Sequence, residues 1–597
     1  MDLRFTDAEP TAQERDLIEA TVPRVEVVEH PGRVVRGGHD ARSQRHLLLP
    51  ALAAVQAGIG HVSEGALMEI CRRLTVPPAE AYGVASFYAL ISTEPRPPRI
   101  AHLCDDVGCG PFGADEVIAE VQRRLGPAGA STDGSGWARS PCLGQCDRAP
   151  AAYLQRAGQE DAVVAGADVS DVDHLVAALD DHPVTAPAVT VPQQGEPGLR
   201  LLARIGSVDP TSLVDHRVHG GGEALRRALE LGPDGVRAEV ATANLRGRGG
   251  AAFPTAVKWD AVAAHDDPKY LICNADESEP GTFKDRVLLE GDPYRLLEAM
   301  TIAAYATGCR IGYLYVRGEY PVATRRLADA IATSRQAGLL GDDVAGAGFA
   351  FDVELRRGQG AYICGEETAL MESIEGHRGE PRNKPPFPTD TGLFGRPTVV
   401  NNVETLLNVT DIVLEGGQAF AELGTRDSTG TRLFCLSGAI AVPGVYEVTY
   451  GETLGALLER AGGVTGELAA VLLGGAAGSF VTAEHLDVPL TFEATRERGL
   501  ALGSGVVMPF DAGTDLGRVV ARIAAFFRDE TCGQCVPCRV GVVRQEEALV
   551  RYLSNGRETV ELELLGDIDR AMTDASICGL GQTAASAVRS AIAQRLV

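Results

Sequence analysis

Apolar side chains recur at the helical period through the N-terminal part of the chain. The segments 44–57 and 63–74 place them on one face, and Pro77-Pro78 interrupts the pattern. We therefore expect residues 1–92 to form a small helical bundle. Cys71 lies within this pattern, which is typical of a buried structural thiol.

The pattern changes after residue 92. A short apolar run at 100–103 predicts a strand, and residues 114–125 have the period of an amphipathic helix. Alternating elements of this kind indicate a compact α/β domain over residues 93–181. Residues 182–198 are rich in Pro, Val and Gln without helical period, so we expect an extended linker there.

Residues 199–427 alternate between strand-like and helix-like stretches. The strand-like runs are 270–273, 311–316 and 351–355, and the helical stretches between them include 294–305 and 320–337. Strands that alternate with helices predict a mostly parallel sheet, which binds ligands at the carboxyl ends of its strands.

The last third of the chain divides into two further units. Residues 428–513 combine strand-like runs, a short helix at 454–458 and glycine-rich turns, and no chemistry is visible in them. Residues 514–597 are helical from Leu516 onwards. The whole pattern predicts a multidomain α/β protein that ends in a helical bundle.

Composition narrows the class of protein. A length of 597 residues predicts several domains, and a net charge of -26 argues against a nucleic-acid or anionic membrane surface. The N-terminal residues carry acids without an apolar core, and no apolar run is long enough to span a bilayer, so we expect a cytoplasmic protein. Thirteen cysteines in that compartment point to metal rather than to disulfides.

A glycine-rich loop at 244–259 is the strongest candidate for an anion site. Gly247, Gly249 and Gly250 allow a sharp turn that brings backbone N–H groups against a phosphate. A helix that begins near Pro254 would add its N-terminus. Positive charge is concentrated around this loop, in Arg246, Arg248, Lys258, Lys284 and Arg286. The spacing matches neither the dinucleotide fingerprint nor the P-loop.

Two further loops follow predicted strands. The segments 274–281 and 358–367 each combine glycines, acids and a hydrogen-bonding side chain. Such groups suit ribose hydroxyls, an amide or a flavin ring, although solvated loop acids are the simpler interpretation of either loop alone.

Eight cysteines fall into two spaced sets. Cys104-x4-Cys109 and Cys142-x3-Cys146 lie in glycine-containing loops, and Cys532, Cys535 and Cys538 form a C-x2-C-x2-C triplet that Cys578 can complete. Thiolates on such loops suit an iron-sulfur cluster, but four thiolates also suit zinc, so the spacing alone leaves both metals open. The triplet is the strongest spacing signal in the chain.

The N-terminal third resembles the 24 kDa-type subunit of respiratory complex I. The resemblance rests on Ala85-Ser-Phe-Tyr88, the Cys104-x4-Cys109 pair and Ser140-Pro-Cys-Leu-Gly-Gln-Cys146. It implies a helical bundle followed by a thioredoxin-like ferredoxin, with a 2Fe-2S cluster held by Cys104, Cys109, Cys142 and Cys146.

The remainder resembles the flavin-bearing 51 kDa-type subunit of complex I and its relatives in NAD-linked hydrogenases and formate dehydrogenases. The stretches that carry the resemblance are 246–259, 272–286, 358–370, 382–388 and 400–405. The resemblance implies a Rossmann-like domain that binds FMN and NAD(H) in one cavity, then a ubiquitin-like domain. A C-terminal 4Fe-4S cluster would be held by Cys532, Cys535, Cys538 and Cys578.

Matching positions assign residues to each cofactor. FMN falls to Gly247, Gly249, Lys258, Asn274, Asp276, Glu277, Tyr362, Gly365, Glu366, Asn401, Asn402 and Thr405, with Arg248 and Gly250 added from the phosphate loop. NAD(H) falls to Phe253, Glu279, Glu367, Lys384 and Phe387. The sequence departs from the family pattern at Ala252, Ala256 and Ala261, of which the last stands where many members have Phe.

The resemblance implies a diaphorase mechanism. NADH gives a hydride and an iron-sulfur cluster takes single electrons, so a flavin must stand between them. Glu279 and Glu367 are the candidate catalytic residues, as positioning or electrostatic groups rather than general bases. The alternative is an electron-transfer or redox-sensing protein with a decayed nucleotide site.

The fusion of two subunits in one chain favours a cytoplasmic NAD-linked enzyme with an iron-sulfur catalytic partner. A molybdenum- or tungsten-dependent formate dehydrogenase is the first expectation, since all four cysteines of the N-terminal cluster are present. A bidirectional nickel-iron hydrogenase is the second expectation, and complex I itself is the third.

Overall fold

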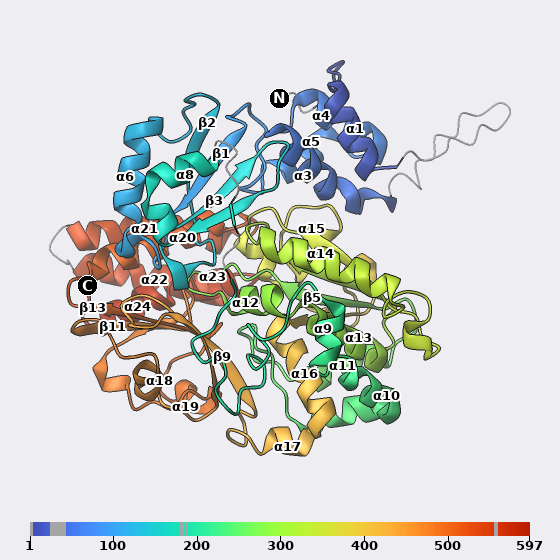
Figure 1. Ribbon diagram of the computed structural model, residues 1–597. Coiled ribbons are helices and arrows are strands. Elements are labelled where there is room, and N and C mark those ends of the chain that lie inside the picture. The colour runs from blue at the N-terminus through green and yellow to red at the C-terminus, as the bar shows by residue number, and fades with distance from the viewer. Residues whose placement is uncertain (1–3, 24–42, 180–183, 186–187, 555–558) are drawn as a thin grey trace.

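The computed structural model describes residues 4–23, 43–179, 184–185, 188–554 and 559–597. Figure 1 shows the helical regions and the sheets arranged around a common centre. The N-terminal helices lie at the top and the C-terminal helices lie beneath the first sheet, so segments far apart in sequence meet near the middle of the molecule.

The N-terminal helices form the expected bundle. They are α1 (Ala12–Thr21), α3 (Leu48–Ile59), α4 (Glu64–Leu74) and α5 (Pro78–Ala85). Helix α4 begins where the Ser63 side chain accepts a hydrogen bond from the Ala66 N–H, an ordinary N-cap. Its buried face includes Cys71, which the hydrophobic pattern had predicted to be a packing residue. The bundle is joined to the rest of the chain by Tyr88, whose hydroxyl donates to Ser373 Oγ at 2.8 Å.

The first sheet places the cysteine loops at one edge. It contains β1 (Arg99–Cys104), β2 (Ser135–Ser140), β3 (Ala151–Arg156) and β4 (Ala162–Ala165) in the order β2-β1-β3-β4, with helices α6 (Ala114–Leu125), α7 (Ala167–Ser170) and α8 (Val172–Leu179). Strands β1 and β2 are parallel, and Cys104 stands opposite Ser140 in their register. The loops that carry Cys109 and Cys142 therefore leave the sheet side by side.

The second sheet is fully parallel, as the strand and helix pattern had predicted. Its order is β7-β6-β5-β8, formed by β5 (Tyr270–Ala275), β6 (Ile311–Val316), β7 (Asp352–Arg357) and β8 (Thr398–Asn402). The surrounding helices are α9 (Leu213–Val218), α10 (Glu223–Thr242), α11 (Thr255–Ala263), α12 (Lys284–Gly291), α13 (Pro293–Thr307), α14 (Pro321–Gln336), α15 (Glu367–Ile374), α16 (Val403–Glu415) and α17 (Gly417–Ala421). Helix α11 begins directly after Pro254, as expected.

The third sheet is mixed. It has the order β10-β9-β13-β11-β12, from β9 (Thr431–Leu436), β10 (Gly444–Thr449), β11 (Leu468–Leu473), β12 (Ser479–Val481) and β13 (Val506–Asp511), with α18 (Leu454–Arg460) and α19 (Phe492–Glu497). The described end of the expected linker is fixed to this sheet, because the Glu447 N–H donates to Gln193 Oε1 at 2.7 Å. The Glu447 carboxylate in turn accepts the backbone N–H groups of Arg200 and Leu202, both at 3.0 Å.

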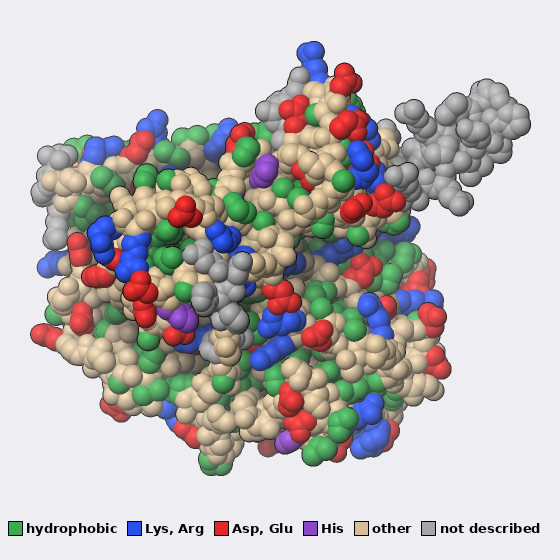
Figure 2. Space-filling view, turned by 45° about the horizontal axis from the view of Figure 1, so that its top comes forward, with side chains coloured by type: hydrophobic (Ala, Val, Ile, Leu, Met, Phe, Trp, Pro, Cys, Tyr) green, Lys and Arg blue, Asp and Glu red, His purple; other side chains and the backbone are tan. Residues whose placement is uncertain are grey.

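The C-terminal region is helical, as the period had predicted. It contains α20 (Leu516–Glu530), α21 (Val536–Ser554), α22 (Thr559–Ala575), α23 (Gly579–Thr583) and α24 (Ser586–Ala593). Throughout the described part of the chain, every helix is too short or too polar to cross a membrane. Acidic and basic side chains are interspersed over the face that Figure 2 shows.

Candidate functional site

A cavity of about 430 Å³ opens at the carboxyl end of the parallel sheet. Loops from the second sheet, the third sheet and the C-terminal helices all contribute to its wall. Its lining includes Gly249, Gly250, Asn274, Asp276, Glu277, Glu279, Lys284, Asp285, Tyr362, Gly365, Glu366, Asn402, Gly474, Ala477, Gly503, Ser504, Gly579, Leu580 and Thr583. The volume is in the range of ordinary cofactor pockets.

The glycine-rich loop is held against β8 and α16. The Gly247 N–H donates to Phe253 O at 2.9 Å and closes the loop, and the Arg248 N–H donates to Thr405 Oγ1 at 2.8 Å. A Cβ added at Gly249 would lie 3.2 Å from the Cβ of Asn402, so the backbone approaches its neighbour closely only because no side chain is present. The loop therefore presents backbone to the cavity.

The Arg248 side chain differs from its expected role. It is fully buried, its Nη2 donates to Thr429 O at 2.8 Å, and its guanidinium lies 4.9 Å from the centre of the Tyr450 ring. The charge that the sequence suggested for a phosphate is thus directed away from the cavity, towards the third sheet. Arg248 therefore contributes to the glycine-rich loop through its backbone N–H, which donates to Thr405, and its side chain lies outside the cavity lining.

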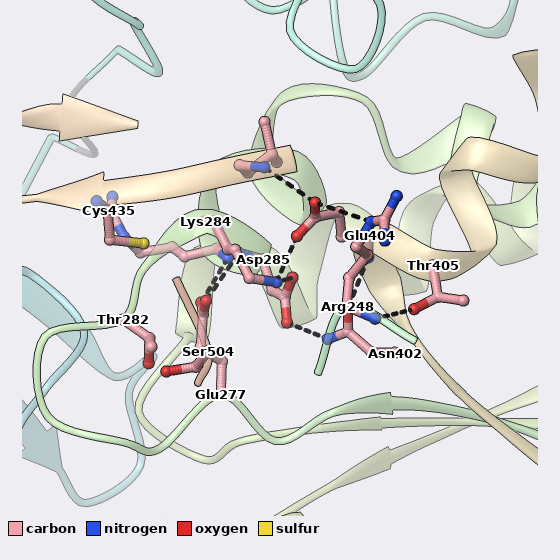
Figure 3. Close-up of polar contacts among 12 residues, drawn as sticks. Arg248, Glu277, Thr282, Lys284, Asp285, Asn402, Glu404, Thr405, Cys435 and Ser504 are labelled. Carbon is pink, nitrogen blue, oxygen red and sulfur yellow. Dashed lines mark hydrogen bonds and ion pairs between the residues drawn. The ribbon is translucent and has the colours of Figure 1, made fainter. Parts of the chain in front are cut away.

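A buried charge cluster adjoins the cavity (Figure 3), and its members Lys284 and Asp285 belong to the cavity lining. Lys284 Nζ lies 2.8 Å from Asp285 Oδ1 and 3.0 Å from Glu404 Oε2. Asp285 Oδ2 also accepts from Asn402 Nδ2 at 2.5 Å, and Glu404 Oε1 accepts from the Leu433 N–H at 3.0 Å. Burial opposes the charge of Lys284, but the two carboxylates outweigh it and raise the pKa of the lysine. Sequence reasoning had noted the charge of Lys284 and had missed Asp285 and Glu404.

Glu277 lies in the loop that follows β5. Its carboxylate accepts the backbone N–H groups of Asp285 and Arg286, both at 3.0 Å, at the start of helix α12. Burial, and then the nearby charge of Asp285, raises the pKa of Glu277 to about 7. Backbone N–H groups of the protein, rather than water molecules, therefore hold the Glu277 carboxylate in place.

Asp276 offers an open hydrogen-bonding position to the cavity. Its Oδ2 atom is buried and accepts no hydrogen bond from the protein, and burial raises the pKa of this carboxyl well above its usual range. The neighbouring Asn274 is fixed, because its Nδ2 donates to Gly365 O at 2.9 Å. An unpaired buried acceptor that lines a cavity fits a ligand with polar hydrogens, such as a flavin ring.

Glu279 is held by the third sheet, where the sequence showed no chemistry. Its Oε1 accepts the Ala477 N–H at 2.9 Å and its Oε2 accepts the Ser504 hydroxyl at 2.9 Å. Burial raises the pKa of Glu279. The interpretation of residues 428–513 as chemically silent is therefore corrected. The signal that could have revealed them is the glycine-rich pair of turns at 474–478 and 503–505.

We expect Gly475→Ala to weaken NADH binding about ten- to a hundredfold, because small displacements of a positioning group have effects of that size. A Cβ at Gly475 would lie 2.6 Å from the Glu279 carboxyl carbon, so the glutamate must move. Gly463→Ala is the matched control, because it has a similar positive φ (85° against 93°) but nothing within 4 Å of the added Cβ. KM for NADH with an artificial acceptor measures the effect. Equal KM values in the two variants would contradict the idea that the position of the Glu279 carboxylate, as Ala477 and Ser504 hold it, determines NADH binding.

A second group of expected residues clusters outside the cavity lining. Glu367 Oε2 pairs with Lys258 Nζ at 2.9 Å and its Oε1 with Lys384 Nζ at 2.8 Å. Burial opposes ionisation of Glu367, but the two ammonium groups outweigh it and lower its pKa. Phe253 and Phe387 are about half exposed, at 48% and 54%. Lys258 Nζ lies 5.8 Å from the centre of the Phe253 ring, and an exposed aromatic ring beside a charge suits a ligand that stacks.

The structure thus sorts the residues that the sequence singled out. Those that line the cavity are Gly249, Gly250, Asn274, Asp276, Glu277, Glu279, Tyr362, Gly365, Glu366 and Asn402. Those outside the lining are Gly247, Arg248, Phe253, Lys258, Glu367, Lys384, Phe387, Asn401 and Thr405. Among the latter, Thr405 and Asn401 support the site from behind, since Thr405 binds the glycine-rich loop and Asn401 accepts from the Trp259 indole N–H at 2.9 Å.

The first cysteine set meets in the interior. Cys142 Sγ and Cys146 Sγ lie 3.4 Å apart, and all four thiols of the set are buried. The hydrogen bonds that Cys104 and Cys146 donate to the Cys109 and Cys142 sulfurs, followed by burial, raise the pKa of Cys104 and of Cys146 well above the usual value. The four sulfurs therefore form one buried group, as an iron-sulfur centre requires.

The second cysteine set lies between α20, α21 and α23. Cys532, Cys535 and Cys578 are partly exposed, and Cys538 is buried. Burial raises the pKa of Cys538 to about 12, and the other three thiols add to that shift, which shows that the four groups lie close together. Because Gly579 and Leu580 line the cavity, this set adjoins it directly.

A larger cavity of about 630 Å³ does not fit a nucleotide. It lies between the first sheet and α20, and its acids outnumber its two arginines, Arg518 and Arg522. The acids are Asp105, Asp106, Asp115, Glu116, Asp511 and Asp515. They would repel phosphate groups.

Comparison with known proteins agrees with this geometry. Three family models match: the Nuo51 FMN-binding domain at residues 240–411, the thioredoxin-like [2Fe-2S] ferredoxin at 37–179, and the NADH-ubiquinone oxidoreductase-F iron-sulfur binding region at 518–594. An F-type subunit of the NADH-quinone oxidoreductase of Rhizobium meliloti is 44% identical over 397 residues, which cover 66% of this chain and 94% of that protein. The chain belongs to the family of NADH-quinone oxidoreductase F-type subunits.

Two further relatives extend the comparison. The NADP-reducing hydrogenase subunit HndC of Solidesulfovibrio fructosivorans is 42% identical over 390 residues, covering 64% of this chain and 79% of that protein. A chain in the crystal structure of an NAD⁺-reducing [NiFe]-hydrogenase in the H2-reduced state is similar over 93% of this chain and 92% of its own length, with 35% identity and a TM-score of 0.79. The F-type module of this chain is thus fused to an N-terminal ferredoxin module, and the fused layout has a structural counterpart.

The matches make this chain an NADH oxidoreductase that uses FMN, NAD(H), a 2Fe-2S cluster and a 4Fe-4S cluster. The residues present fit these groups. Asp276 Oδ2, which has no hydrogen-bond partner among the described residues, and the Cβ-free Gly249 suit a flavin in the cavity, and the two sets of four thiols suit the clusters. The preference for iron-sulfur over zinc is confirmed.

Proposed function

We propose that this chain is the diaphorase subunit of a larger complex and exchanges electrons between NAD(H) and a partner's iron-sulfur catalytic subunit. The observation that carries the proposal is continuity. The cavity that presents Gly249 and Asp276 is also lined by Gly579 and Leu580, the two residues that follow the cluster cysteine Cys578. An electron leaving the cavity therefore meets a cluster ligand directly.

The cavity residues divide between the two nucleotides. We assign FMN to the glycine-rich loop, the β5 loop and the start of α16, that is, to the FMN set predicted from the sequence, with Arg248 contributing its backbone. We assign NAD(H) to Glu279 and to the exposed group of Phe253, Phe387, Lys384 and Glu367. The support is that Lys384 Nζ also pairs at 2.8 Å with Glu366, which lines the cavity, and that Lys258 of the first set lies 5.8 Å from the centre of the exposed Phe253 ring.

Positioning is the main catalytic contribution of the protein. Bound FMN supplies the ability to take a hydride and release single electrons. The Ser504 hydroxyl and the Ala477 N–H hold the Glu279 carboxylate at the cavity wall, and two lysines hold the Glu367 carboxylate ionised. Neither glutamate needs to move a proton for hydride transfer, so both act by orienting the nicotinamide nucleotide.

The partner docks beside the C-terminal cysteines. Helix α21 follows the partly exposed Cys535 and carries an exposed apolar stripe of four valines at helical spacing, Val536, Val540, Val543 and Val550. Exposed apolar patches of this kind mark protein interfaces. A redox centre on the partner that covers this stripe would lie next to the 4Fe-4S ligands.

We propose a molybdenum- or tungsten-dependent formate dehydrogenase as the complex, with a cytoplasmic location. The support is the complete and buried set of N-terminal cluster cysteines. The second candidate is a nickel-iron hydrogenase, which the end-to-end similarity to the [NiFe]-hydrogenase chain favours. The similarity to quinone oxidoreductase subunits favours complex I as the third.

Native purification of the complex tests these proposals. NADH is expected to bleach the flavin absorbance, and metal analysis is expected to find a pterin-bound metal together with formate-dependent NAD⁺ reduction. Nickel and hydrogen-dependent NAD⁺ reduction would replace the formate assignment with the hydrogenase. A flavin that NADH fails to bleach would instead support a redox-sensing protein with a decayed nucleotide site.

A further inference from the structure

A buried arginine connects the flavin cavity with the 2Fe-2S cysteine loop. Arg317 follows β6 and is only 2% exposed. Its Nη1 donates to Glu277 O at 2.7 Å, and its Nη2 donates to Cys142 O at 2.7 Å. The same guanidinium pairs with Glu319 at 2.9 Å and lies 5.0 Å from the centre of the Tyr320 ring. One side chain therefore fixes a peptide of the cavity wall and a peptide of a cluster ligand.

Two neighbouring side chains complete this contact. Arg286 Nη2 donates to both carboxylate oxygens of Asp147, at 2.7 and 2.8 Å, directly after the last cysteine of the loop. Tyr320 packs so closely on Gly144 that a Cβ there would lie 2.2 Å from the Tyr320 hydroxyl oxygen. The cysteine loop at 142–147 thus rests on side chains that belong to the second sheet.

We propose that Arg317 is the residue that sets the reduction potential of the 2Fe-2S centre, acting as a positioning residue through the Cys142 peptide. Reduction adds one electron to a cluster that thiolates already make anionic, and no bond is made or broken. A buried cation hydrogen-bonded to a ligand's peptide stabilises the reduced cluster relative to the oxidised one. The carboxylate of Glu319 opposes part of that effect.

The charges of Arg317 and Glu319 predict the direction in which each substitution shifts the midpoint potential of the 2Fe-2S centre. The Arg317 guanidinium is positively charged at any ordinary pH, and its Nη2 lies 2.9 Å from Glu319 Oε1. Its Nε donates to the other carboxylate oxygen of Glu319 at 3.2 Å, so the two side chains form a two-point ion pair. Both groups are therefore charged, and removing either one changes the electrostatic potential at the cluster in a known direction.

Redox titration of the full chain, followed by EPR, tests the proposal. Arg317→Met is expected to lower the midpoint potential of the 2Fe-2S signal, Arg317→Lys to lower it less, and Glu319→Gln to raise it. The 4Fe-4S signal in the same samples is the internal reference. Arg325→Met is the matched control, because Arg325 lies on the adjoining helix α14 and pairs with the exposed Glu160 at 2.7 Å.

Opposite shifts separate an electrostatic role from a structural one. A loosened loop would move the potential in the same direction in all three variants, whereas a charge effect reverses sign between Arg317 and Glu319. If Arg317→Met loses the cluster, the lysine variant and Glu319→Gln decide the matter. An unchanged midpoint in these two, or a fall in Glu319→Gln, would overturn the proposal.

Discussion

Replacing Gly249 with glutamate is expected to yield a folded chain that lacks flavin. The backbone at this position lines the cavity, and even a Cβ would lie 3.2 Å from the Asn402 Cβ. A longer side chain must enter the cavity and would place a carboxylate where the phosphate loop presents its N–H groups. Electrostatic repulsion and lost space act together, so we expect flavin affinity to fall more than about a hundredfold, or at least about 3 kcal/mol.

Flavin released by denaturation, counted per chain, measures this effect. Gly566→Glu is the control, because it makes the same chemical change on helix α22 with nothing within 4 Å of the added Cβ. Circular dichroism checks that both variants fold. Flavin content equal to that of the parent in Gly249→Glu would show that the phosphate loop has been assigned to the wrong segment.

Substituting Cys578 by alanine is expected to remove the 4Fe-4S cluster and stop electron delivery to the partner. The residue is the only member of its set outside the C-x2-C-x2-C triplet, and it joins that triplet to α23. Three thiolates leave one iron of a cubane without its protein ligand. NADH should still reduce a dye that accepts electrons directly from the flavin. The substitution changes none of the residues that line the cavity, although Cys578 directly precedes the lining residues Gly579 and Leu580.

Iron and sulfide analysis with EPR checks this result, and Cys104→Ala provides the reciprocal experiment. Cys104→Ala should remove only the 2Fe-2S signal, since Cys104 ends strand β1 of the first sheet and belongs to the buried set of four cysteines. Cys71→Ala is the control for loss of a buried thiol, because Cys71 packs in the N-terminal bundle. Retention of all six irons per chain in the Cys578 variant, instead of the two of the 2Fe-2S cluster, would show that another group completes the second set.

Local periodicity was enough to predict much of this fold. Helix 114–125 and strand 311–316 coincide with α6 and β6, because each forms from its own amphipathic or apolar pattern. Strand β8 (Thr398–Asn402) was missed, since its pairing with β5 is a long-range contact that its short sequence does not signal. That pairing brings Asn402 beside Asn274 and so completes one wall of the cavity.

The site was predictable where chemistry lies in the spacing of residues and less so where it depends on the direction of a side chain. Cysteine spacing predicted two sets of four cysteines, and the family models support a 2Fe-2S and a 4Fe-4S cluster in the regions that contain them. The sequence could not show that the Arg248 guanidinium points into the third sheet, because that direction depends on the distant partners Thr429 and Tyr450. For the same reason it could not show that Ser504 and Ala477, which lie far along the chain from Glu279, hold its carboxylate.

The cavity wall also determines when the flavin can be loaded. Its lining runs from Gly249 to Thr583, so the part of the wall that α23 supplies is synthesised long after the glycine-rich loop. Domains that emerge earlier fold as units while synthesis continues. The cofactor can reach the exposed glycine-rich loop during that time, but it cannot be enclosed until α23 docks. In this enzyme, enclosing the flavin therefore depends on α23 as well as on the glycine-rich loop, although the two are far apart in sequence.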